Sequence, residues 1–178
     1  MGNDGLVLPL GAGSGIVTLR CHICKRRMSA WLSPPVFDAT GNRTSGGFGC
    51  AGCHAPPEFD IDPNTKNNGI IGVLNGTGID ITNTRAPSLR DLVNPNGTLN
   101  SPLMHTGIFT NLQTLIGHYG NINIAPGNTN LDPRLMPNGF GQKLNVTATE
   151  VNSVIAFIKT LTGNDVYVNP KWSDPFSL

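Results

Sequence analysis

Charged residues are scarce in this sequence, and long apolar stretches are missing. Only 13% of the 178 residues are charged, and the net charge is +1. The largest basic cluster, Lys25–Arg27, is too short to form the basic surface that nucleic acid binding requires. No run of 18 or more apolar residues occurs, so the sequence predicts no membrane-spanning helix. Nucleic acid and a membrane span are therefore not expected for this chain.

The beginning of the chain lacks a recognisable export signal. Residues 5–17 are mildly apolar but rich in glycine, and no basic residue precedes them. The first 30 residues also show no helical or strand periodicity. We expect residues 1–37 to be an atypical N-terminal segment, either poorly ordered or a truncated remnant. Either the natural N-terminus differs from this one, or any export signal lies outside this chain.

The most informative feature that is present is the pentapeptide at residues 50–54, with the pattern C-x-x-C-H. Two thiols three residues apart can add across the two vinyl groups of a haem, and the histidine that follows can bind the iron as proximal ligand. The sequence therefore favours one covalently attached haem c, held by Cys50, Cys53 and His54.

A second C-x-x-C pair, Cys21 and Cys24, leaves alternatives open, because a lysine follows it where a histidine would be expected. The two pairs together could supply four thiolates to a zinc ion in a structural module, although the 25 residues between them exceed the usual spacing of a zinc ribbon. The other interpretations are a disulfide, a second haem with a lysine ligand, and a pair of incidental cysteines.

The 22 glycines and 14 prolines predict long loops between short helices. Ser88 is a candidate N-cap of a short helix that ends at Asn94. A second helix is expected from Thr110 to about Tyr119, and a third from Thr147 to about Leu161, each opening with capping-box spacing. We therefore predict a mainly α fold with almost no sheet. The chain is expected to have three parts, which are the N-terminal segment 1–37, a haem domain at 38–163 and a tail at 164–178.

A haem held by one histidine leaves a sixth position on the iron. Met104 is the best candidate for it, because Pro102 and Gly107 place it in a non-helical loop 50 residues beyond His54. A methionine is also a common core filler, so this assignment competes with a purely structural role. The remaining candidates are Met28, Met136, His105 and His118.

Several motifs, taken in order along the chain, resemble the C-terminal haem domain of the bacterial di-haem cytochrome c peroxidase and MauG family. They cover roughly two-thirds of the chain. The motifs are residues 50–54 (CAGCH), 84–90 (TRAPSLR), 102–107 (PLMHTG), 112–119, 131–135 (LDPRL) and 155–163 (IAFIKTLTG).

The resemblance implies a cytochrome c-like domain wrapped around one covalent haem. In that family this haem is the electron-accepting centre of an enzyme that reduces hydrogen peroxide. Cys50 and Cys53 would then be the thioether anchors, His54 the proximal ligand and Met104 the distal ligand. Because a His–Met haem has no open site, the resemblance implies electron transfer and no catalytic residue in this chain. Arg85 and Arg90 would lie near the haem, as propionate partners or in surface salt bridges.

The resemblance also implies partners and a location. A small electron-donor protein would reduce the haem, and the peroxide-reducing haem would come from a separate domain or from a homodimer partner. That second domain, with its own C-x-x-C-H motif, is absent from this chain, so a calcium ion shared between the two domains is expected only with the missing domain. Covalent haem implies a periplasmic location.

Overall fold

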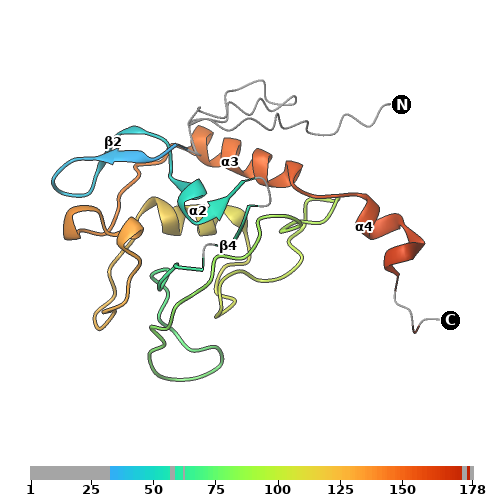
Figure 1. The fold of residues 1–178 in the computed structure, drawn as a ribbon, viewed down its shortest axis with the longest axis horizontal. Helices are drawn as coiled ribbons and strands as arrows, with labels where there is room; N and C mark the ends of the chain where they lie inside the picture. The colour runs from blue at the N-terminus through green and yellow to red at the C-terminus, as the bar shows by residue number, and fades with distance from the viewer. Residues whose placement is uncertain (1–32, 57–58, 62, 174–175, 177–178) are drawn as a thin grey trace.

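The computed structural model describes residues 33–56, 59–61, 63–173 and 176. The described part begins with an antiparallel hairpin, in which β1 (Pro35–Phe37) pairs with β2 (Arg43–Gly46). This hairpin lies beside the N-terminal end of α3 at the upper left of Figure 1. The side chain of Arg43 joins the two elements, because it forms a 2.8 Å ion pair with Glu150 and also lies over the ring of Phe48.

Two helices form the centre of the fold. The first, α2 (Leu112–Gly120), begins at Asn111, whose side chain accepts a hydrogen bond from the backbone N–H of Thr114. The second, α3 (Ala148–Thr160), begins with a complete capping box between Thr147 and Glu150. Both predicted helices are confirmed, although Asn111 caps α2 in place of Thr110.

The core lies where α2 and α3 meet the loops around them. Leu112 and Ile116 of α2 belong to the same buried cluster as Val154 and Ile158 of α3. Phe157 extends this cluster to the segment after His54, because its ring makes an edge contact with Phe59 at 5.5 Å between centroids. A second, smaller cluster contains Ile122, Leu131 and Leu135, with Tyr119, Ile124 and Met136 packed against it.

Short elements connect and extend these units. They are the 3-10 helices η1 (Cys50–Gly52), η2 (Pro133–Leu135), η3 (Pro137–Gly139) and η4 (Pro170–Trp172), the strands β3 (His54–Ala55) and β4 (Asp60–Ile61), and the one-turn helix α4 (Asp165–Val168). The C-terminal segment with α4 projects away from the central helices in Figure 1. None of the described helices is long and apolar enough to cross a membrane.

The prediction of a mainly α fold is wrong. Only 28% of the structure is helical, 13% lies in strands, and β1–β2 and β3–β4 form two small sheets. The helix expected after Ser88 does not form, since the chain there makes a turn and then an isolated bridge from Val93 to Leu99. The Ser88 hydroxyl accepts a hydrogen bond from the N–H of Arg90, and Asp91 adopts a left-handed backbone with φ 53°. A residue in that region interrupts a right-handed helix.

Several expectations fall outside the described residues. They include most of the N-terminal segment 1–37, with Cys21, Cys24, Lys25 and Met28.

Candidate functional site

The C-x-x-C-H pentapeptide forms a tight turn followed by a strand. Cys50–Gly52 make one turn of 3-10 helix, closed by a hydrogen bond from the Cys53 N–H to the Cys50 carbonyl at 3.2 Å. Gly49 precedes this turn with φ 73°, and a side chain there would approach the Pro35 ring to 2.9 Å. His54 then enters β3, where it pairs with Ile61 of β4. The turn and the strand thus give the two cysteines and His54 fixed backbone positions.

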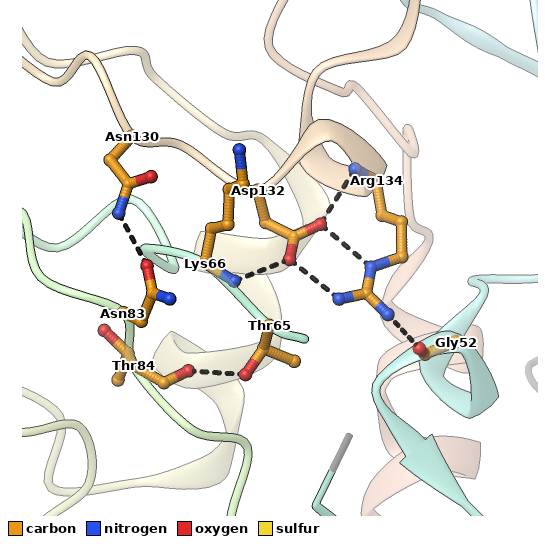
Figure 2. A network of polar contacts seen from close by, with 8 residues as sticks. All are labelled: Gly52, Thr65, Lys66, Asn83, Thr84, Asn130, Asp132 and Arg134. Carbon is orange, nitrogen blue, oxygen red and sulfur yellow. Dashed lines mark hydrogen bonds and ion pairs between the residues drawn. The ribbon is translucent and has the colours of Figure 1, made fainter. Parts of the chain in front are cut away.

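A network of ionic hydrogen bonds from residues distant in the sequence holds the same turn in place (Figure 2). The Arg134 guanidinium donates a hydrogen bond to the Gly52 carbonyl, 82 residues earlier in the chain. Asp132 orients this guanidinium with two bonds of 2.8 Å and also accepts the backbone N–H of Lys66 at 2.9 Å. Sequence patterns identify residues 131–135 only as part of a motif, because nothing local reveals that Arg134 reaches Gly52.

The two cysteines do not form a disulfide with each other, and the surroundings favour an uncharged thiol at Cys50. Burial raises the pKa of Cys50 to about 12. His54 is also kept uncharged, since burial lowers the pKa of its imidazole. The backbone carbonyl groups of Pro87 and Phe59 act in the opposite direction on this pKa. A neutral imidazole is the form that binds a metal.

A cavity of about 1030 Å³ lies against the pentapeptide, and Cys50, Cys53, His54 and Met104 all line it. It is at the upper end of the roughly 300–1,000 Å³ range of small-molecule sites. Apolar side chains from both central helices form much of its wall, including Leu115, Ile116, Val154 and Ile158. Lys66, Arg85 and Arg134 also line it.

Met104 is presented by a small irregular hairpin. Leu103 and Phe109 form an antiparallel bridge, and the Gly107 N–H donates to the Met104 carbonyl at 3.0 Å. Met104 itself has φ 69°, a left-handed conformation that costs a non-glycine residue roughly 1–2 kcal/mol. Its sulfur accepts a hydrogen bond from the side-chain amide of Asn68 at 3.1 Å. Strain of this kind is often kept where a side chain has a functional position.

The other candidate ligands lie in different surroundings. His105 lines the cavity, but it is exposed and its Nε2 is 3.0 Å from the Gly72 carbonyl oxygen. His118 is bonded through Nε2 to the Asn68 carbonyl, and Met136 packs in the second apolar cluster. Met28 lies outside the described residues. Of the two arginines singled out in the sequence, Arg85 lines the cavity and Arg90 is not part of its lining.

Sequence reasoning missed several polar residues at this cavity, among them Lys66, Asn68 and Tyr119. Asn68 and Lys66 lie in a stretch that gave no motif, and Tyr119 was named only as the approximate end of its helix. Burial, and next the nearby Cys53 and Cys50, raise the pKa of the Tyr119 hydroxyl far above its usual value. The Lys66-Asn67-Asn68-Gly69 run signals a turn, but its position beside Met104 depends on long-range packing.

The chemistry of the cavity fits a haem. Its apolar walls suit a flat macrocycle, and the basic side chains of Lys66 and Arg85 could face the two carboxylates of the haem. The donor groups also suit a haem, because the two thiols and a neutral imidazole line the same cavity. Across the residues that the structure describes, no three His, Cys, Asp or Glu side chains gather as a metal-ion site.

Replacing Asp132 with asparagine should destabilise the protein by about 2 kcal/mol, the cost of breaking hydrogen bonds to a charged group. Burial opposes ionisation of Asp132, but hydrogen bonds from Arg134 and Lys66 outweigh it and hold its pKa at about 2. A carboxyl whose folded pKa is depressed stabilises the fold above its unfolded pKa, and this contribution is lost as pH falls through the folded value. The difference between wild type and Asp132→Asn should therefore shrink from about pH 4 to pH 2.

Urea denaturation at a series of pH values measures this difference. Asp165→Asn is the matched control, because Asp165 also has a lowered pKa but lies in the exposed C-terminal segment. We expect little change in that control. An Asp132→Asn protein as stable as wild type at pH 7 would contradict the role assigned to the network.

Comparison with known proteins yields a structural likeness and no match to a family model. No protein-family model matches the sequence, and no curated protein matches it. Among solved structures, the chain is similar to a MauG-like protein associated with microbial copper homeostasis, at 27% identity and a TM-score of 0.47. The match covers 72% of this chain and 46% of the other, so this chain spans less than half the length of that protein.

Proposed function

We propose that this protein binds one haem c covalently and transfers electrons through it. The observation that carries the proposal is that Cys50, Cys53, His54 and Met104 line a single cavity of about 1030 Å³. The two thiols would form the thioether bonds, His54 would be the proximal ligand and Met104 the distal one. The bound haem would supply a reversible Fe(III)/Fe(II) couple.

The residues around the cavity have distinct parts in this proposal. Arg134 holds the C-x-x-C turn through the Gly52 carbonyl, so that both thiols keep their spacing. Lys66 and Arg85 would provide positive charge for the haem carboxylates, since both line the cavity. The apolar side chains of α2 and α3 would exclude water from the macrocycle, and a dry surrounding raises the effect of the axial ligands on the potential.

The His–Met pair favours electron transfer over direct peroxide chemistry. A neutral thioether stabilises Fe(II) relative to Fe(III) and so raises the reduction potential, and two axial ligands leave no position for a substrate. Together with the sequence motifs shared with di-haem peroxidases, this supports a role as the electron-accepting half of a peroxidase that reduces hydrogen peroxide. A small electron-donor protein would be one partner, a peroxide-reducing haem domain the other, and the periplasm the site of action.

Expression with the haem-maturation machinery tests this proposal. A pyridine haemochrome spectrum should give one covalent haem per chain, and metal analysis should give no stoichiometric zinc. Zinc without haem would instead support a structural module built on Cys21, Cys24, Cys50 and Cys53. Peroxide turnover by the isolated six-coordinate protein, without loss of the Met104 ligand, would contradict the electron-transfer role.

A further inference from the structure

We infer that Asn68 is a positioning residue for Met104, and that its side-chain amide sets the strength of the methionine as an iron ligand. The main evidence is the 3.1 Å hydrogen bond from Asn68 Nδ2 to Met104 Sδ at the wall of the cavity. Asn68 and Met104 both line this cavity. The inference rests on the proposed function, since it assumes that Met104 binds the haem iron.

The orientation of the Asn68 amide is fixed by a second bond. Its Oδ1 accepts the backbone N–H of Ile70 at 3.0 Å, which only an oxygen can do. The other end of the amide, the NH₂ group, must therefore face the sulfur. This short side-chain turn removes the freedom of the amide to rotate and present its oxygen to Met104.

The backbone of Asn68 is tied to α2. The ring of His118, in the last turn of that helix, lies with Nε2 at 2.9 Å from the Asn68 carbonyl oxygen. Gly69, with φ 93°, packs closely on this ring, because a Cβ there would lie 3.2 Å from it. A rigid helix thus positions the donor, and the donor positions Met104 in its left-handed loop.

A thioether sulfur has two lone pairs, and the hydrogen bond occupies one of them. The bond therefore selects which lone pair remains for the metal, and so the configuration at sulfur. The bond also holds the sulfur in place, so that its other lone pair stays directed to the metal. Removing the amide should loosen the hold on Met104, and because methionine ligation favours Fe(II), weaker ligation should lower the reduction potential.

Two neutral variants of the haem-loaded protein separate the effect of the hydrogen bond to the Met104 sulfur from the effect of the hydrogen bond that closes the turn at Ile70. Asn68→Leu removes both bonds and keeps the branched shape of the side chain. Asn68→Ser can still accept the Ile70 N–H, but its side chain is one bond too short to replace Nδ2. For both variants we expect a lower reduction potential and about fivefold tighter binding of imidazole in place of Met104, the effect of one ordinary hydrogen bond. The NMR shifts of the haem methyl groups should change pattern, because they report the configuration at sulfur.

The outcomes distinguish this inference from the proposed function. If the wild-type ferric protein lacks the methionine–iron charge-transfer band, the ligand pair is wrong, and the inference falls with it. If the band is present but both variants keep the wild-type potential and imidazole affinity, only the role of Asn68 is overturned. It is also overturned if Asn68→Leu alone changes these values, because the turn at Ile70 would then be the cause.

Discussion

Replacing Cys50 and Cys53 together with serine should reduce the covalent haem content from one per chain to none. Serine hydroxyls are too weakly nucleophilic to add to the vinyl groups, so no thioether bond can form. We also expect the double variant to lose most of its tertiary stability. A haem in the cavity would pack against part of the buried core, and the variant would lack these contacts. The core residues that line the cavity include Phe48, Leu103, Ile116, Val154 and Ile158.

The matched control is the double variant Cys21→Ser with Cys24→Ser. It removes the same chemical groups from the other C-x-x-C pair, and the haem proposal predicts full haem content in the pyridine haemochrome assay. Loss of haem from both variants would contradict the assignment of the attachment site to residues 50–54. Loss of zinc from both, with no haem in the wild type, would support the four-thiolate alternative. Thermal unfolding followed at the haem absorption band measures the change in stability.

The parts of the fold that the sequence predicted are those governed by local rules. The helix at Ala148–Thr160 has its cap, its first-turn acid and its apolar face within one continuous stretch, and the structure reproduces all three. The start of α2 was predicted to within a residue or two, because Thr110 and Asn111 are both good caps and only Asn111 is used. Local signals of this type require no knowledge of distant residues.

Long-range contacts explain the failures. Asp91 was assigned to a helix, but its side chain accepts the N–H of Gly163 at 3.0 Å, and its backbone is left-handed. The strand β1 begins with Pro35, which weakens any strand signal, and it forms because β2 pairs with it. The helix predicted after Ser88 was thus overruled by partners that a local pattern does not contain.

The candidate site also has some residues that local patterns identify and others that depend on long-range contacts. The pentapeptide and Met104 can be found from residue types and spacing, and the structure brings them to one cavity. The residues that orient them cannot be found in this way. Arg134 reaches Gly52 across 82 positions, and Asn68 reaches Met104 across 36. A donor to sulfur has no sequence signature, and only the fold identifies it.

Replacing Met104 with alanine should open the sixth position on the iron. We expect the methionine–iron charge-transfer band to disappear and the reduction potential to fall, because the neutral thioether that favours Fe(II) is gone. Imidazole should bind about 100-fold more tightly if Met104 occupies the iron in about 99% of wild-type molecules, since a competing internal ligand reduces apparent affinity by the fraction of open sites. Alanine keeps the steric cost of the left-handed backbone at φ 69°, so the loop is not relaxed as it would be by glycine.

Met136→Ala is the matched control, because Met136 packs in the second apolar cluster and not at the cavity. It should lower stability while leaving the band, the potential and the imidazole affinity unchanged. Peroxide turnover is the decisive further measurement. An increase in Met104→Ala alone would mean that the ligand normally blocks a competent haem. A wild-type protein already active with its methionine bound would contradict the argument that a closed His–Met site only relays electrons.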